Sequence, residues 1–296
     1  SVQLSRRARN HTQVRCGGRA RPATGSSGSK PNWPPPPGQA EYTNLMRYIL
    51  VFCVLLCTVV FAENSAYTKF RELLAGGHYH SAARINGPDL IADYPTDPEA
   101  YYLYANALYF GGDVAEAEQQ LEQAFALAAE PPATYLWLRG LIRSSQGRLP
   151  DALNDLRAAY QREQTYDIAM TLGTIGWQLA EFEIALEAFA AASETTRGKR
   201  ELWPYLAAGR VHLALQHYDD ALQAFTTAID IFEAHDTGSL GLPSPGYVEA
   251  FYRLGQTYEA LGNYTQAEVQ YRAARSSDPN YAPAIAGLDR LSRRVE

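Results

Sequence analysis

The feature that most constrains the fold of this sequence is a set of alanines that recur at a nearly constant spacing. They are Ala82, Ala117, Ala152, Ala185, Ala221 and Ala267, at intervals of 35, 35, 33, 36 and 46 residues. A glycine stands five residues before four of these alanines, at Gly77, Gly112, Gly147 and Gly262. A period of this length is the signature of a repeat architecture, in which similar supersecondary units stack on one another. We therefore predict one continuous array from about residue 63 onward.

The last copy of the repeat carries the most complete motif. In order along the chain, its residues are Phe251, Leu254, Gly255, Tyr258, Ala267, Tyr271, Ala274 and Pro279. Their order and spacing match the tetratricopeptide pattern, and residues 63–296 resemble a tetratricopeptide repeat (TPR) protein. The resemblance implies an all-α fold, namely a right-handed α-solenoid of about six helix-turn-helix repeats with a C-terminal capping helix.

Small and large residues alternate between the two helices of each copy. The small residues of the first helices are Ala105, Gly140, Gly173, Gly209 and Gly255, and the large residues of the second helices are Leu121, Leu156, Phe189, Phe225 and Tyr271. A small side chain lets the two helices approach closely, and a large one fills the space between adjacent hairpins. Because one hairpin cannot bury its apolar face alone, we expect the stacked copies to share a continuous core.

Two copies depart from the pattern. In the first, Asn86 replaces the large apolar residue, and Gly87-Pro88 is predicted to interrupt the second helix. Before the last copy, residues 236–247 (DTGSLGLPSPGY) contain three glycines and two prolines, which predicts an inserted loop. The solenoid is thus predicted to span residues 63–281, and residues 282–296 are predicted to form the capping helix.

The first 45 residues differ from the rest in composition and charge. Residues 1–45 contain seven basic residues and one acidic residue, are rich in Gly, Ser and Pro, and are predicted to be disordered. Residues 63–296 contain 18 basic and 31 acidic residues, and an acidic body of this kind argues against binding to nucleic acid. We interpret residues 1–45 as a leader upstream of a native start at Met46, or alternatively as a transit segment for an organelle.

An uncharged apolar run lies between these two regions, from residue 48 to residue 62. It follows Met46-Arg47, ends in Val60-Phe61-Ala62 and is shorter than the roughly 20 residues that a spanning helix needs. Residues 46–62 are therefore predicted to be a signal peptide that is cleaved after Ala62, which makes the protein periplasmic or secreted. If residues 48–62 are not cleaved, the protein is anchored in a membrane instead.

The sequence offers little sign of catalysis or metal binding. The only cysteines are Cys16, Cys53 and Cys57, so the body can form no disulfide or cysteine-ligated metal site. His78 and His80 stand two apart with no third ligand nearby, and the remaining histidines of the body are scattered along the repeats. No nucleophile motif or phosphate-binding glycine loop is present. We therefore predict a protein that is not an enzyme and that has no metal site and no cofactor.

The resemblance implies a concave groove lined by the first helix of each repeat. By register, its outward positions hold Tyr67, Arg71, Tyr102, Asn106, Tyr109, Phe110, Trp137, Leu141, Met170, Thr174, Trp177, Trp203, Leu206, Arg210, Tyr252 and Gln256. Tyrosine, tryptophan and arginine are enriched in binding hot spots, although some of these aromatics are equally expected to pack inside the solenoid. A receptor for chaperone tails is not predicted, since Lys69 and Lys199 are the only lysines of the body.

Three functions are compatible with this pattern. The leading hypothesis is an exported scaffold or adaptor that binds a peptide or protein along the groove. The first alternative is a structural subunit of a cell-envelope complex that uses its convex face or the loop at 236–247. The second alternative is a binder of glycans or other small ligands through the groove aromatics.

Overall fold

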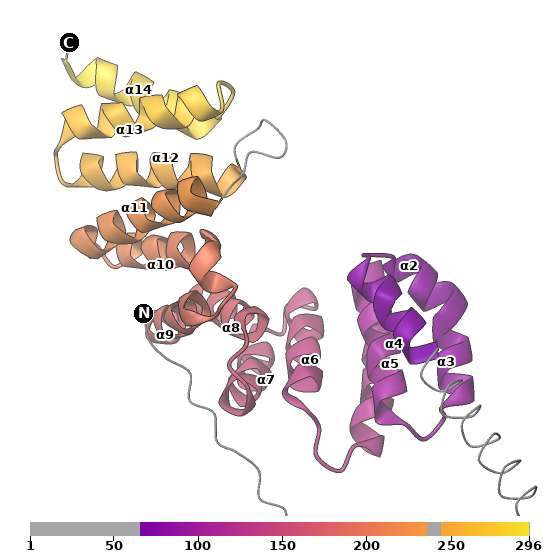
Figure 1. Ribbon diagram of the computed structural model, residues 1–296. Helices are drawn as coiled ribbons and strands as arrows, with labels where there is room; N and C mark the ends of the chain where they lie inside the picture. Colours follow the sequence, from indigo (N-terminus) through magenta and orange to yellow (C-terminus); the bar gives the residue numbers. More distant parts are fainter. Residues whose placement is uncertain (1–65, 236–243, 296) are drawn as a thin grey trace, which may run out of the picture. The chain divides into compact units, whose positions relative to one another are not determined.

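The computed structural model describes residues 66–235 and 244–295, and all regular elements in these two ranges are helices (Figure 1). The first pair consists of a helix at 66–75 and a helical stretch made of α2 (Tyr79–Ser81), the π-helix η1 (Ala82–Asn86) and α3 (Gly87–Asp93). Four further pairs are α4 (Pro98–Gly111) with α5 (Val114–Leu127), α6 (Ala133–Ser145) with α7 (Leu149–Arg162), α8 (Tyr166–Gln178) with α9 (Phe182–Glu194), and α10 (Trp203–Ala214) with α11 (Tyr218–His235). The short 3-10 helix η2 (Gly198–Arg200) precedes α10.

The last pair is α12 (Pro245–Ala260) with α13 (Tyr264–Ser277), and α14 (Ala282–Val295) packs beside it. Within the described ranges, the structure thus contains six helical hairpins followed by one more helix. From α4 to α13, each helix contacts its hairpin partner most extensively, and successive hairpins contact one another along the series. This arrangement confirms the predicted all-α solenoid of about six repeats with a C-terminal capping helix.

The turns inside the hairpins follow from local backbone chemistry. Gly112 closes α4 with φ at 95°, in the left-handed region that side chains disfavour. The next residue, Asp113, donates its N–H to the carbonyl of Leu108 at 2.8 Å, which satisfies one of the open carbonyls at the helix end. Ala180 and Gln216 adopt the same conformation with φ near 60° in the fourth and fifth hairpins, so the turn persists where glycine is absent.

Close packing inside the hairpins confirms the predicted role of the small residues. A Cβ built on Gly209 would lie 2.5 Å from Cε1 of Phe225, which is shorter than any ordinary contact. The pairs Gly173–Phe189 and Gly255–Tyr271 have the same spacing. The aromatic ring of the second helix therefore lies directly on the backbone of the first.

The first hairpin differs from the prediction at Gly87-Pro88, because the helix continues through this dipeptide. Gly87 donates its N–H to the carbonyl of Ala82, five residues earlier, as in a π-helix. Pro88 then occupies the first turn of α3, where a missing N–H is tolerated. Gly87 is also needed for packing, since a Cβ there would lie 2.2 Å from the ring of Tyr104. The predicted interruption of the second helix is therefore wrong, because the wider turn of the π-helix accommodates Gly87-Pro88.

The predicted loop before the last hairpin is shorter than expected. Helix α12 begins at Pro245, with Ser244 at its N-cap, so Pro245 to Tyr247 are helical. Proline is favoured in the first helical turn, which explains why PGY begins the helix although it reads as loop. The rest of the predicted loop, 236–243, lies outside the described residues.

The predicted disordered leader at 1–45 and the predicted signal peptide at 46–62 also lie outside the described residues. Among the helices that the structure does describe, none combines the length and the apolar character needed to cross a membrane.

Candidate functional site

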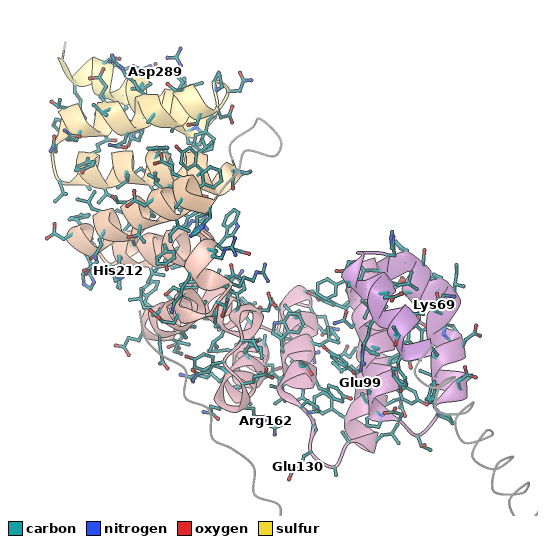
Figure 2. The ribbon with its side chains drawn as sticks, viewed as in Figure 1. Lys69, Glu99, Glu130, Arg162, His212 and Asp289 are labelled. Atoms are coloured by element: carbon teal, nitrogen blue, oxygen red, sulfur yellow. The ribbon has the colours of Figure 1, made fainter. Side chains whose placement is uncertain are left out.

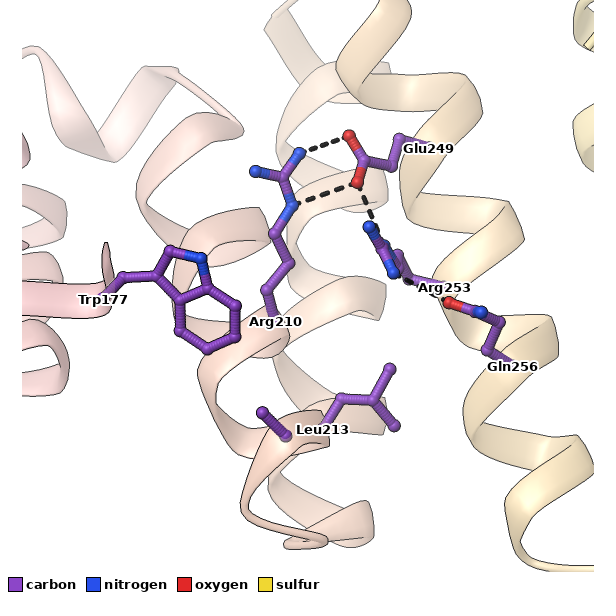
Figure 3. Close-up of a pocket in the computed structure, with 7 residues that line it drawn as sticks. Trp177, Arg210, Leu213, Glu249, Arg253 and Gln256 are labelled. Carbon is purple, nitrogen blue, oxygen red and sulfur yellow. Dashed lines mark hydrogen bonds and ion pairs between the residues drawn. The ribbon is translucent and has the colours of Figure 1, made fainter. Parts of the chain in front are cut away.

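A pocket of about 450 Å³ lies on the face formed by the first helices of the fourth, fifth and sixth hairpins, and we call it the α8–α12 pocket (Figure 3). Its lining residues are Trp177 from α8, Arg210, Leu213 and Ala214 from α10, and Glu249, Arg253 and Gln256 from α12. Residues more than seventy positions apart in the sequence thus line one depression. The stacking of first helices, which the repeat imposes, is what brings them together.

The polar side of the pocket is organised around the carboxylate of Glu249. Arg210 approaches it side-on, with Nε 3.0 Å from Oε1 and Nη2 in contact with Oε2. Arg253 donates from Nε to Oε1 at 3.0 Å and from Nη1 to the amide oxygen of Gln256 at 2.9 Å. Figure 3 shows the three charged groups converging between α10 and α12. Two guanidinium groups and one carboxylate give this part of the pocket a net positive charge within an otherwise acidic body.

The apolar side of the pocket is made by Trp177 and Leu213. Trp177 is 36% exposed and packs against Phe182, with 5.6 Å between the ring centroids. Its indole lies across from the aliphatic stem of Arg210 (Figure 3). An exposed indole that is fixed by a neighbouring ring offers a flat apolar surface at little cost in conformational entropy. The pocket can therefore hold an apolar side chain next to a charged or polar group.

The α8–α12 pocket contains three of the predicted groove residues, namely Trp177, Arg210 and Gln256. The other four lining residues were missed by the sequence analysis. Leu213 could have been found, because it stands 36 residues after Trp177 and occupies the equivalent place in α10. Glu249 and Arg253 carry no comparable signal, since their proximity to Arg210 depends on how α12 packs beside α10.

Several other predicted groove residues pack between neighbouring hairpins. Tyr102 stacks on Tyr135, with 4.6 Å between the ring centroids, and Trp137 donates its indole N–H to Thr171 at 3.0 Å. Tyr252 packs edge-on against Tyr281. Tyr67, Tyr102, Trp137 and Tyr252 all occupy the same register, three residues before the close-packing position of their helix. Their rings join successive repeats, which is the alternative role that the sequence analysis expected for some of the aromatics.

Tyr67 shows how this inter-repeat contact is made. Its hydroxyl donates a hydrogen bond to the carboxylate of Asp97 in the next repeat. Burial, followed by the hydrogen bond to Asp97, raises the pKa of Tyr67 far above its ordinary value. The phenol therefore remains a neutral donor even at an alkaline pH where an ordinary tyrosine ionises.

The structure corrects the prediction at one groove position, Leu206, and places Trp203 beside a different cavity. Leu206 is only 1% exposed and belongs to the core beneath α10, because the same register here holds an aliphatic residue that the next hairpin covers. Trp203 is exposed, but it lies at the start of α10 beside Phe232 and His235, where it lines a smaller cavity of about 170 Å³. Trp203 is not among the residues that line the α8–α12 pocket.

The remaining predicted groove residues lie mainly on the first helices of the N-terminal hairpins. Phe110 is exposed and stacks on Tyr79, with Tyr109 edge-on beside it. Arg71 is paired with Glu99 at 3.1 Å. The others, Asn106, Leu141, Met170 and Thr174, are partly or fully exposed on α4, α6 and α8. The α8–α12 pocket, which draws on three successive repeats, is the candidate site on this face.

Comparisons with known proteins agree with the repeat architecture. The family model for the tetratricopeptide repeat matches residues 105–168 and 206–282. No curated protein matches the sequence significantly. Among solved structures, the chain resembles YrrB, which is described as a TPR protein with an unusual peptide-binding site. The TM-score is 0.57 and the sequence identity is 20%, and the match covers 68% of this chain and 96% of YrrB.

Two further structures are similar at lower or comparable identity. PilF of Pseudomonas aeruginosa matches with a TM-score of 0.59 and 14% identity, covering 78% of this chain and 96% of PilF. MamA matches with a TM-score of 0.52 and 19% identity, covering 62% of this chain and 93% of MamA. At these identities the likeness shows the fold alone. The family model in two segments, the repeat motifs and the six stacked hairpins together identify the solenoid as one built of tetratricopeptide repeats.

Proposed function

We propose that this protein is a non-enzymatic adaptor that binds an extended peptide or protein segment across its first-helix face, with the α8–α12 pocket at the centre of the contact. The observation that carries the proposal is the convergence of an exposed tryptophan and two arginines from three successive repeats. Tryptophan and arginine are the residue types that most often dominate binding energy. A site that spans three repeats also requires a ligand long enough to contact them all.

The charges of the pocket indicate what the bound segment should contain. Glu249 holds Arg210 and Arg253 in place, and each guanidinium has more N–H donors than this one carboxylate can accept. A carboxylate or backbone carbonyl of the ligand can take the remaining donors. We therefore expect a segment with an acidic residue close to an apolar side chain, with the apolar group against Trp177.

Relatives in fold support this use of the surface without identifying the ligand. YrrB is described as having a peptide-binding site, and it shares the TPR fold with this chain at 20% identity. TPR scaffolds supply a shape, while surface residues choose the partner. The proposal for this chain therefore depends on its own pocket residues.

The test is to compare partner recovery by matched variants in extracts of the native cell. Trp177→Ala and Arg253→Gln remove the apolar and the charged side of the pocket, and Arg157→Ala changes an exposed arginine on α7, a second helix. We expect the two pocket variants to lower recovery of the partner by about tenfold, as hot-spot truncations do, and the control to leave it unchanged. Circular dichroism confirms that all three keep their helical content.

Equal recovery by the pocket variants and the unmodified protein would overturn the proposal. A loss confined to Arg157→Ala would favour a structural subunit that uses the convex face. Heat on titration with glycan fragments, abolished by Trp177→Ala while protein recovery is unchanged, would favour the glycan-binding alternative.

We further propose that the protein is exported after cleavage at Ala62. The support is the sequence alone, namely a short apolar run behind Met46-Arg47 and a polar stretch from Glu63. N-terminal sequencing of the protein isolated from its native cell should give Glu63 as the first residue. An intact apolar run in the membrane fraction would show an anchor instead.

A further inference from the structure

The turn between α10 and α11 brings together three side chains that can bind a metal ion. His212 lies near the end of α10, His217 follows the turn, and Asp220 lies in the first turn of α11. One ligand atom from each of them lies within 4.8 Å of the other two. Figure 2 shows His212 at the end of this hairpin. From the sequence alone these histidines were expected to be scattered along the repeats, and no recognisable motif links them.

Backbone hydrogen bonds of the turn explain why the two imidazoles meet. His217 donates its N–H to the carbonyl of His212 at 2.9 Å, and Gln216 donates to Leu213 at 3.1 Å. This pair of bonds is a Schellman motif, in which the residue after the turn folds back over the residue that accepts its N–H. The ring centroids of His212 and His217 are 6.2 Å apart as a result.

The same turn occurs in every described hairpin, which provides an internal comparison. The residues joined by the equivalent hydrogen bond are Leu73 and His78, Leu108 and Asp113, Arg143 and Arg148, Gly176 and Glu181, and Tyr258 and Asn263. Among these described turns, the one between α10 and α11 alone places an imidazole at both positions. The motif itself therefore does not require histidines, and their pairing here calls for a separate explanation.

One polar atom of the His212 side chain lacks a hydrogen-bond partner. Its Nδ1 atom is buried and has no hydrogen-bond partner. The nearest carboxylate oxygen, Oδ2 of Asp220, is 3.9 Å away, which is too far for a hydrogen bond. Buried polar atoms almost always have a partner, and an ion or a water molecule bound between the two side chains would supply one.

The spacing of the three groups suits a small cation with nitrogen and oxygen ligands. In a tetrahedral zinc site, bonds of about 2.0–2.2 Å place neighbouring ligand atoms about 3.3 Å apart. Since the ligand atoms lie within 4.8 Å of one another, the three groups need to close by up to about 1.5 Å to reach this geometry. His217 and Asp220 are exposed and can move by side-chain rotation, while the Schellman motif holds their backbones.

We infer that His212, His217 and Asp220 form a binding site for a divalent transition-metal ion, for which Zn²⁺ is the best match. Two imidazoles and one carboxylate are the ligand types of three-residue zinc sites, which leave a fourth position for water or another donor. A bound ion would tie the end of α10 to the start of α11. Because Leu213 and Ala214 follow His212 and line the α8–α12 pocket, it would also fix one wall of that pocket. The inference does not depend on the proposed peptide-binding function.

Calorimetric titration of ZnCl₂ into the full chain, purified without a histidine tag, tests the site. The site variants are His217→Ala and Asp220→Asn, both at exposed positions that leave the fold intact, together with His212→Ala. The controls are His235→Ala, at the far end of α11, and the double variant His78→Ala/His80→Ala. We expect the unmodified protein and both controls to bind one more Zn²⁺ per chain than each site variant.

Thermal unfolding gives a second readout, which compares the stability of matched variants and does not require the bound ions to be counted. Zn²⁺ should raise the melting temperature of the unmodified protein and of His235→Ala, and this rise should be absent in His217→Ala. Equal zinc stoichiometry in the unmodified protein and His217→Ala, or an equal thermal shift in both, would overturn the inference. The same holds if the unmodified protein binds no zinc at all.

Discussion

Arg139 and Asp155 are joined by two parallel hydrogen bonds inside the third hairpin, at 3.0 and 2.7 Å. Asp155 is only 5% exposed, and Arg143 contacts the same carboxylate at 2.7 Å. The two arginines occupy register positions where the last hairpin has Leu254 and Tyr258. The third repeat therefore replaces part of the usual apolar packing between its helices with an ion triad, in which a buried carboxylate pairs with two partly exposed arginines.

Removal of the shared carboxylate should destabilise the protein. Asp155→Ala leaves two arginines without their partner, and breaking a buried ion pair from one side costs about 3 kcal/mol. Denaturation by urea measures the change in the free energy of unfolding. The control is Asp151→Ala on the exposed side of the same helix, which should cost about 0.5 kcal/mol because it changes only the helix-dipole interaction. Equal effects of the two variants would show that the triad adds nothing to stability.

The close contact between Gly209 and Phe225 leads to a prediction about paired residue sizes. Gly209→Ala places a methyl group in the ring of Phe225 and should cost about 2 kcal/mol, as overpacking of a core does. The second hairpin has Ala105 opposite Leu121 at the equivalent positions, so alanine is compatible with leucine there. The double variant Gly209→Ala/Phe225→Leu should therefore lose less free energy of unfolding than the two single variants lose together. Strict additivity in urea denaturation would contradict this explanation.

The hairpins and their stacking could be predicted from the sequence because the packing contacts repeat with the same period as the residues. In every copy after the first, a small residue on the first helix lies opposite a large one on the second and allows the two helices to pack closely. The continuous helix at Gly87-Pro88 could not be predicted in this way, since the π-helix that accommodates the dipeptide has no sequence signature of its own. The helical start at Pro245 could not be predicted either, because the sequence PGY is equally compatible with a turn and with the first turn of a helix.

The candidate site was less predictable for a physical reason. Tyr109 and Trp177 occupy the same register on equivalent helices, yet Tyr109 donates to the carbonyl of Leu141 in the next hairpin and Trp177 remains exposed. Their roles depend on the partner that the adjacent repeat presents, which a single repeat cannot reveal. The convergence of His212 with Asp220 likewise depends on the exact geometry of the turn.

The capping helix should loosen in acid through Glu259. Arg290 donates two hydrogen bonds to Glu259 at 2.9 and 2.7 Å, and these bonds hold the pKa of Glu259 below its ordinary value. A carboxylate with a lowered folded-state pKa contributes stability above the unfolded pKa, near 4.3, and loses it as the pH falls through the folded value. Glu259→Gln should therefore lower the free energy of unfolding by about 1.5 kcal/mol at pH 7. The difference from the unmodified protein should shrink toward pH 3.

Glu268→Gln is the matched control for this prediction. Glu268 pairs with Arg272 on the same helix, and both side chains are well exposed. Its replacement should have a small effect at either pH, since exposed ion pairs contribute little. A pH-independent loss in Glu259→Gln would show that Glu259 acts through packing and not through its charge.

Site-specific photo-crosslinking in the native cell tests most directly whether the first-helix face binds the partner. The photoreactive residue p-benzoylphenylalanine is placed at Leu213, in the α8–α12 pocket, or at Arg157, exposed on a second helix. The adaptor proposal predicts a crosslinked partner from position 213 that is lost when Trp177→Ala is added, and no such product from position 157. Crosslinks from position 157 alone, or from position 213 regardless of Trp177, would contradict binding in the pocket.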